Sequence, residues 1–311
     1  MNKEEAKISN LATLDESLLG EDEKLSELLL SFARLSLNMQ TQFPKYLSGI
    51  ENDRNKYGEA VAKLDAWANK ILCDTLLDTG FVRAIYSEEL RQPIKGNKSA
   101  PFVITLDPLD GSSNITTNNA FGIIMGVYED DLPQPGRNLS AAVYKLYGPV
   151  NTLVYSTGNG VHEFVKHYYE DGDAKFLQLH KNLKLPDKPE VFGIGGDPLE
   201  WDAKFLTFAK DLFRKEKMRP RYSGTFVADF SQVLHRGGFF AYPKTTSKPK
   251  GKLRLYYECS PLSFICEQAG GMSWDGGKGS ILDHFDTDAD ARVPLYLGNK
   301  EIINKLKEAM K

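Results

Sequence analysis

The sequence predicts a mixed α/β protein built in layers. The chain begins with two segments of helical periodicity, continues with short apolar runs bounded by turn residues, and ends with both kinds of segment interleaved. Its 311 residues reach the length at which one hydrophobic core stops growing. We therefore expect one large domain or two tightly packed ones, with no internal repeat.

Two amphipathic helices are expected first. Residues 22–40 place apolar side chains among charges at near-helical spacing, and residues 58–79 repeat the pattern. Gly80 stands where a glycine commonly ends a helix. The polar stretch 48–57 between the helices predicts a mobile connection.

Six short runs rich in β-branched and aromatic residues then predict strands. These runs are 81–86, 102–106, 123–128, 141–146, 152–155 and 161–168. The following stretch, 171–190, is rich in Lys and Asp and holds two prolines. It predicts a boundary between two halves, 1–185 and 186–311.

The second half alternates helical and strand patterns. Helices are expected at 201–217, 223–236, 260–268 and 300–310, strands at 239–242 and 293–297, and a Lys/Pro loop at 244–251.

Charge and cysteine content exclude several classes of protein. The 39 basic and 42 acidic residues give a net charge of −3, which leaves no positive excess for a nucleic acid or an anionic membrane. Three widely spaced cysteines without a C-x-x-C pair argue against a disulfide framework and a thiolate zinc site. The acidic start carries no targeting pattern, and no apolar run approaches membrane length. A reducing cytoplasm is expected.

The most informative motif is Asp107-Pro108-Leu109-Asp110, directly after a buried-looking strand. Pro108 interrupts the strand ladder, so both carboxylates can face one space, and Leu109 can offer its carbonyl oxygen. The next residues, 111–113, give a tight turn with two hydroxyls at a helix start, a place suited to a phosphate. The alternative is an ordinary surface turn in which Ser112 caps a helix.

Further acids follow other elements. Glu88 and Glu89 follow the strand at 81–86, and Glu258 precedes the helix at 260–268. Glu258 is otherwise explained as a helix-start carboxylate. Oxygen ligands without His or Cys favour Mg²⁺ or Mn²⁺, and an ion would relieve the repulsion among gathered carboxylates.

The D-P-L-D-G-S-S run with the upstream Glu pair resembles the metal-dependent, lithium-sensitive sugar phosphatase superfamily, and within it class I fructose-1,6-bisphosphatase. The resemblance extends from about Leu25 to Gly298. Its other motifs are Arg221–Gly224, Val227–Asp229, Gly237–Gly238, Tyr242–Pro243, Gly251–Leu255, Tyr257–Cys259 and Ala269–Gly271. It implies a five-layer α-β-α-β-α sandwich whose N-terminal half holds the metals and whose C-terminal half holds the sugar bisphosphate.

The resemblance implies hydrolysis of the 1-phosphate of fructose-1,6-bisphosphate that depends on Mg²⁺, with Mn²⁺ as the alternative ion. It also implies two or three ions in each subunit of a homotetramer. The implied metal ligands are Glu88, Asp107, Leu109 through its carbonyl, Asp110, Glu258 and, in a third site, Glu59. Glu89 and Asp65 would activate the attacking water. Asp65 otherwise lies on the solvated face of a helix.

The same resemblance implies two phosphate subsites. Gly111, Ser112 and Ser113 would hold the phosphate that is cleaved. The other phosphate would be held by Tyr222, Tyr242, Lys252 and, from a neighbouring subunit, Arg221. Without the family, Lys252 is explained as a solvated lysine and the tyrosines as half-buried sheet residues.

The substrate segment departs from the family. Its Asn-Glu-Gly-Tyr segment corresponds here to Gly195–Pro198, and Phe226 replaces a Met at the sugar. Sedoheptulose-1,7-bisphosphate, or both bisphosphates, is therefore an alternative substrate. An inositol monophosphatase-like hydrolase is a further alternative, although that branch carries Trp-Asp-x-x-Ala-Gly at 257–261. A phosphate-binding scaffold is the alternative outside the enzymes.

We predict that AMP does not inhibit the protein at the site used by animal enzymes of this family. Those enzymes bind AMP through Thr-Gly-Glu-Leu-Thr, a Tyr and an Arg, whereas this chain has Asp22–Ser26, Phe102 and Glu129. An acid at the Arg position repels a phosphate. Phosphate release measured across an AMP titration should stay constant; inhibition by micromolar AMP would contradict the prediction.

Overall fold

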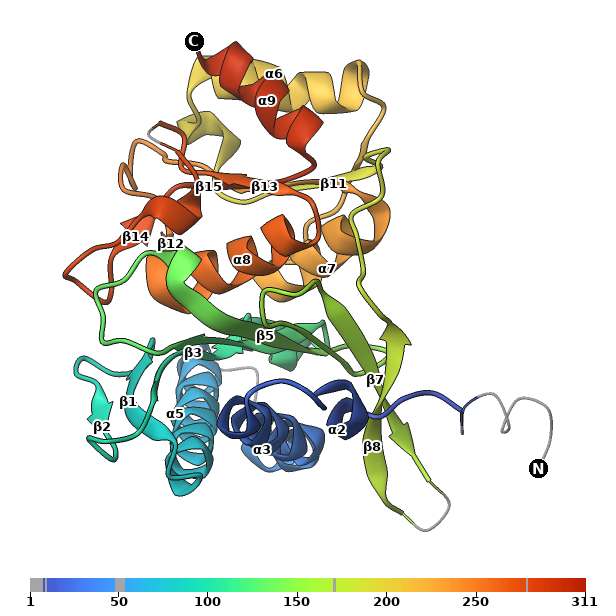
Figure 1. Cartoon of the computed structure of the whole chain (residues 1–311). Coiled ribbons are helices and arrows are strands. Elements are labelled where there is room, and N and C mark those ends of the chain that lie inside the picture. Colours follow the sequence, from blue (N-terminus) through green and yellow to red (C-terminus); the bar gives the residue numbers. More distant parts are fainter. Residues whose placement is uncertain (1–7, 9, 48–53, 170–171, 278) are drawn as a thin grey trace.

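The computed structural model describes residues 8, 10–47, 54–169, 172–277 and 279–311. It stacks helices and sheets in the order α-β-α-β-α, as Figure 1 shows from bottom to top. The predicted layered α/β sandwich is therefore confirmed. Among the described residues, no helix is both long and apolar enough to span a membrane.

The first layer consists of α3 (Glu23–Met39) and α5 (Arg54–Asp78), with the short α2 (Leu14–Ser17) and α4 (Phe43–Leu47) beside them. Both predicted helices are present. Asp22 caps α3 by accepting a hydrogen bond from the Leu25 N–H at 2.9 Å. Of the predicted mobile connection, residues 48–53 lie outside the described residues, and α5 begins earlier than predicted.

The second layer is an eight-stranded sheet in the order β2-β1-β3-β4-β5-β6-β7-β8. Its strands are β1 (Val82–Ser87), β2 (Ile94–Lys95), β3 (Phe102–Asp110), β4 (Phe121–Tyr128), β5 (Leu139–Tyr147), β6 (Thr152–Ser156), β7 (His162–Tyr168) and β8 (Ala174–His180). β1 and β3 are parallel, while the other neighbours are antiparallel.

Strand β8 lies inside the stretch 171–190, in which the sequence predicted a boundary and no strand. β8 is an edge strand that buries Phe176 and Leu177 and leaves its other side chains partly or fully exposed. Polar residues are typical of such edges because they discourage pairing with other chains. The division at 185/186 stays a prediction.

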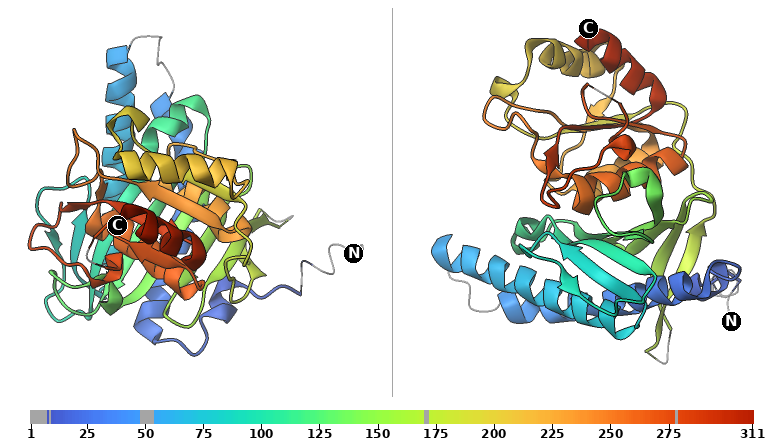
Figure 2. Two further views of the ribbon diagram at one scale, coloured as in Figure 1. Left: turned by 90° about the horizontal axis from the view of Figure 1, so that it is seen from above. Right: turned by 60° about the vertical axis from the view of Figure 1, so that its left-hand side comes forward.

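The middle layer contains α7 (Phe226–Arg236) and α8 (Ser260–Gln268), and the outer layer contains α6 (Ala203–Arg214) and α9 (Lys300–Met310). Figure 2 shows α6 and α9 side by side, at the opposite end of the molecule from α3 and α5. Between these layers lies a five-stranded sheet. In order, its strands are β10 (Arg219–Pro220), β9 (Val191–Ile194), β11 (Gly238–Tyr242), β15 (Leu295–Gly298) and β13 (Met272–Trp274).

The strand predicted at 293–297 is two strands. β14 (Arg292–Val293) pairs with β12 (Leu253–Arg254), and β15 begins only at Leu295. Pro294, which lacks an N–H, stands between them.

Three clusters of buried apolar side chains fill the spaces between the layers. The first joins α3 and α5 to one face of the large sheet, the second surrounds α7 and α8, and the third lies between the small sheet and the outer helices. The apolar residues whose spacing predicted the helices and strands are the residues that these elements bury.

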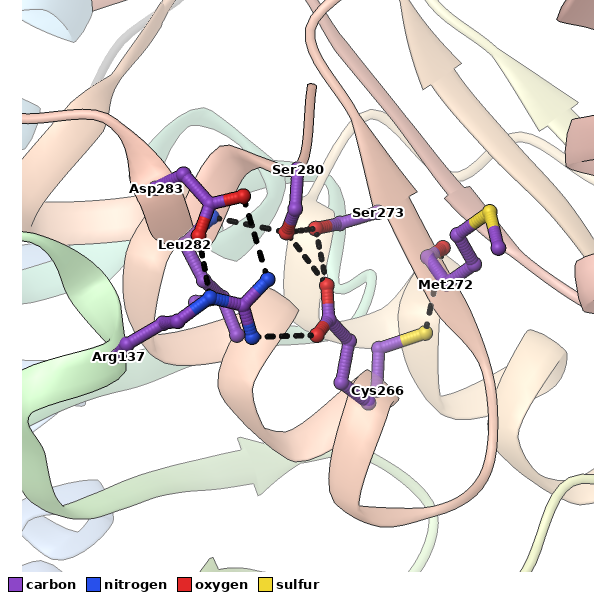
Figure 3. A network of polar contacts seen from close by, with 8 residues as sticks. Arg137, Cys266, Met272, Ser273, Ser280, Leu282 and Asp283 are labelled. Carbon is purple, nitrogen blue, oxygen red and sulfur yellow. Dashed lines mark hydrogen bonds and ion pairs between the residues drawn. The ribbon is translucent and has the colours of Figure 1, made fainter.

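A polar network at the surface ties the two halves together (Figure 3). Arg137, in the connection from β4 to β5, contacts Asp283 and also Glu267 on α8, the latter at 3.4 Å. Ser273 and Ser280 donate to the same Glu267 carboxylate at 2.8 and 2.6 Å. The Arg137 side chain is half exposed, so these ion pairs contribute modestly to stability.

Candidate functional site

The site begins at the ends of two parallel strands. Ser87 of β1 pairs with Leu106 of β3, and the next N–H, of Glu88, donates to the Leu106 carbonyl at 3.0 Å. Glu88, directly after β1, and Asp107, within β3, therefore lie where the parallel pairing of the two strands ends. The register between β3 and β4 shifts between Asp107 and Asp110, where Pro108 lies, as the sequence predicted.

Glu258 comes to the same place from the middle layer. It lies on a π-helix, Leu255–Cys259, directly before α8, and its Oε2 accepts the Arg254 N–H at 2.7 Å. Oxygen atoms of Glu88, Asp107 and Glu258 lie within 4.8 Å of one another. Such a set of hard oxygen donors fits a divalent ion such as Mg²⁺ or Mn²⁺.

Asp110 is held by the start of α7. Its carboxylate accepts hydrogen bonds from the Thr225 hydroxyl and the Val227 N–H, both at 2.6 Å, and from the Phe226 N–H at 3.2 Å. The free N–H groups and the positive end of the helix dipole stabilise the buried charge.

A cavity of about 220 Å³ joins these residues. Of the predicted site residues whose side chains are described, all line it except Asp65 and Arg221. Glu59 belongs to the part of α5 whose side chains lie outside the described residues.

Burial dominates the electrostatics of the carboxylates. Burial and repulsion from neighbouring carboxylates together raise the pKa of Glu258 to about 8 and that of Glu88 to about 7, against the opposing effect of Arg254. The pKa of Asp107 lies well above its usual range for the same two reasons. Burial also raises the pKa of Asp110, although its hydrogen bonds with Thr225 and α7 oppose the rise. A bound cation would reverse these shifts, because it stabilises the charged forms.

Asp65 lies at the rim. Its carboxylate accepts a hydrogen bond from the Ser112 hydroxyl at 3.3 Å, and burial followed by repulsion from Glu89 raises its pKa to about 6. Asp65 therefore faces the site rather than open solvent. Glu89 lines the cavity and is exposed.

The far end of the cavity carries phenols and an ammonium group. The hydroxyls of Tyr222 and Tyr242 lie 3.1 Å apart, and Lys252 Nζ donates to Tyr242 at 3.0 Å. Gly195 packs against the Tyr242 ring, where a Cβ atom would come within 2.3 Å. Arg221 is exposed and lies outside the cavity of its own chain.

Sequence reasoning missed three residues that shape the site. Thr225 had no signal of its own, since a single hydroxyl at a helix start is common. Arg254, which contacts Glu88, stands four residues before Glu258, a spacing that could have indicated a charge pair. Arg292 lines the cavity from β14. It was missed because the sequence predicted one strand at 293–297, and Arg292 stood outside it.

This fold and cavity define a phosphatase of the layered sugar phosphatase class. Models of two domains match the chain: "Fructose-1-6-bisphosphatase, N-terminal domain" at residues 21–179 and "Fructose-1-6-bisphosphatase, C-terminal domain" at 185–311. The chain belongs to the class 1 fructose-1,6-bisphosphatase family.

Individual relatives agree. The class 1 fructose-1,6-bisphosphatase of Methanocorpusculum labreanum is 40% identical over 252 residues, covering 81% of this chain and 77% of that protein. That of Natronomonas pharaonis is 38% identical over 260 residues, covering 84% and 89%. The holo crystal structure of Leishmania major fructose-1,6-bisphosphatase superposes with a TM-score of 0.85 at 28% identity, covering 97% of this chain and 99% of that one. These matches favour this family over the inositol monophosphatase-like alternative.

We predict that Thr225→Val weakens metal binding by about 10- to 100-fold, because Asp110 loses a buried hydrogen bond that holds it in place. Mg²⁺ binding followed by calorimetry, and the Mg²⁺ dependence of activity, measure the effect. Thr207→Val is the matched control, since Thr207 is exposed on α6 and its hydroxyl donates to the Ala203 carbonyl of the same helix. Equal Mg²⁺ affinity in both variants would contradict the role of Thr225.

We also predict that Mg²⁺ stabilises the fold more at high pH than at low pH. The pKa of Glu258 rises from 4.5 to about 8 on folding. A carboxyl shifted in this direction stabilises the fold below its unfolded pKa and loses that contribution as the pH rises through its folded pKa. The Tm of the metal-free protein should therefore fall between about pH 5 and about pH 8, and Mg²⁺ should reduce the fall.

Differential scanning calorimetry with EDTA or Mg²⁺ across this range measures the effect. Glu258→Gln should flatten the profile of the metal-free protein, whereas Glu308→Gln, an exposed control on α9, should leave it unchanged. An Mg²⁺-induced change in Tm that is the same at all pH values is the contrary outcome.

Proposed function

We propose that the protein hydrolyses the 1-phosphate of fructose-1,6-bisphosphate, giving fructose 6-phosphate and inorganic phosphate, with Mg²⁺ or Mn²⁺ as cofactor. The observation that carries the proposal is one cavity with gathered carboxylates at one end and Tyr222, Tyr242 and Lys252 at the other. Family membership and the relatives' names support the same activity.

The proposed metal ligands are the side chains of Glu88, Asp107, Asp110 and Glu258 and the Leu109 carbonyl, with Glu59 in a third site. When bound, two or three divalent ions would neutralise the phosphate oxygens and lower the pKa of water near the phosphorus. The donor set supports this role because it contains only oxygen atoms, three of which come within 4.8 Å of one another.

Chain residues would perform the remaining steps. Glu89 and Asp65 would orient the attacking water and accept its proton, and the pKa of about 6 at Asp65 suits a base near neutral pH. Gly111, Ser112 and Ser113 would hold the phosphate that is cleaved, in line with the water. No covalent phosphoenzyme is required.

The second phosphate would lie between Tyr222, Tyr242 and Lys252, with Arg221 of a neighbouring subunit completing the subsite. The exposure of Arg221 outside its own cavity is compatible with this arrangement. We therefore propose a homotetramer as the working form. Within each subunit we propose two halves, 1–185 and 186–311. The three free cysteines, all buried, favour a reducing cytoplasm.

A second candidate substrate is sedoheptulose-1,7-bisphosphate. Residues 195–198, which replace a phosphate-binding segment of the family, do not line the cavity, and Phe226 does. Fewer polar groups at that end would relax the choice of sugar length.

Phosphate-release assays with both bisphosphates, with Mg²⁺, Mn²⁺ or EDTA, test the proposal. We expect metal-dependent turnover of fructose-1,6-bisphosphate and a loss of about 10³-fold in kcat for Asp110→Asn, because charge developed in the transition state is left uncompensated. Asp74→Asn, exposed on α5, is the matched control and should retain activity.

Comparison of kcat/KM for the two sugars decides the substrate. A large preference for fructose-1,6-bisphosphate would exclude the heptulose as the main substrate. If no metal released phosphate and Asp110→Asn matched the parent protein, a phosphate-binding scaffold would replace the enzyme proposal.

A further inference from the structure

A second group of potential metal ligands lies apart from the carboxylate cavity. Glu163 on β7, His180 at the end of β8 and His235 near the end of α7 come together from three elements. Glu163 Oε2 lies 2.7 Å from His180 Nδ1 and 2.8 Å from His235 Nε2. None of the three residues lines the cavity.

Glu163 is buried, with only 2% of its surface exposed. A buried carboxylate needs a charged or hydrogen-bonding partner, and among the described residues its ion-pair partners are the two histidines. Half of the His180 side chain and about a third of the His235 side chain are exposed. The cluster thus has a buried anion at its base and two imidazoles open to solvent, which gives an ion a path of entry.

His235 is already oriented as a metal-binding histidine would be. Its Nδ1 lies 2.7 Å from the Ser231 carbonyl oxygen, an acceptor, so Nδ1 carries a proton and donates it. The other nitrogen, Nε2, lies 2.8 Å from Glu163 Oε2 and donates its proton there; loss of that proton to an ion leaves Nε2 as the ligand atom. A hydrogen bond from the remote ring nitrogen to a backbone carbonyl is the usual support of a metal-bound histidine.

We propose that Glu163, His180 and His235 bind a transition metal ion of the Zn²⁺ type at the edge of the large sheet. Two imidazole nitrogens and one carboxylate favour Zn²⁺, Co²⁺ or Ni²⁺ over Mg²⁺, whereas the all-oxygen cavity has the opposite preference. Tetrahedral ligand atoms at zinc lie about 3.3 Å apart, so small side-chain rotations would make room for the ion. Water would fill the fourth position.

The ion would link β7, β8 and α7, and it would displace the proton that His235 Nε2 otherwise shares with Glu163. It would therefore stabilise the folded protein, by an amount that grows with the logarithm of its free concentration above the Kd. The site is a structural one, since none of its ligands reaches the catalytic cavity.

Titration of the Mg²⁺-loaded protein with Co²⁺ tests the proposal, because tetrahedral Co²⁺ with nitrogen ligands has a strong visible absorption band. We expect a band that saturates at one equivalent and a Tm that rises with Zn²⁺. His180→Gln is the first variant, since the half-exposed side chain can be replaced without emptying the core. It should weaken Co²⁺ binding by about tenfold or more.

Three further variants make the result specific. His235→Gln should also weaken the band, whereas His167→Gln, a control on the same strand as Glu163, should keep it. Asp110→Asn should keep the band as well, because Asp110 belongs to the other cavity. Absence of a saturable band, an unchanged band in both His180→Gln and His235→Gln, or loss of the band only in Asp110→Asn would overturn the proposal. These readouts are independent of phosphatase activity.

Discussion

The position of the Asp110 carboxylate is the constraint on which the site depends. Both of its oxygens accept hydrogen bonds from the start of α7, so the end of β3 in the large sheet is fixed to the middle helical layer. Gly111 makes this approach possible: its φ of 77° is unfavourable for other residues, and a Cβ atom there would lie 2.4 Å from the Thr225 Cβ. α7 is in turn fixed to the second sheet, because Phe226 at its start stacks on Phe240 of β11 with ring centroids 4.6 Å apart.

Charge compensation explains why the cavity needs more than its protein groups. Arg254 contacts Glu88 and Asp290 through its guanidinium and donates its N–H to Glu258. Asp107 is different. Its pKa is raised first by burial and then by three neighbouring carboxylates, and one backbone N–H, from Leu109, opposes them. Buried negative charge without a cation is costly, so a divalent ion beside Asp107 is the arrangement that this geometry supports best.

The sequence was sufficient for features that depend on local pattern. The apolar faces of α3 and α5, the acids directly after β1 and those in the last part of β3 could be predicted, because helix period, strand propensity and residue type determine them. β8 could not, because an edge strand buries only a few side chains. Thr225 and the Glu163 cluster could not either, because their roles arise when segments far apart in the chain meet. Glu163 and His235 are separated by 72 residues, and no spacing rule connects them.

Helix α7 contacts the catalytic cavity at its start and the Glu163 cluster at its end. Its first N–H groups hold Asp110, and His235, in its last turn, contacts Glu163. A helix of 11 residues is about 16 Å long, which is too far for either group to act on the other by direct contact. Coupling between them would need an element with two alternative arrangements. A helix packed between two sheets has a single arrangement. An ion at Glu163 would thus act on catalysis through the stability of the layer that positions Asp110, rather than as an allosteric switch.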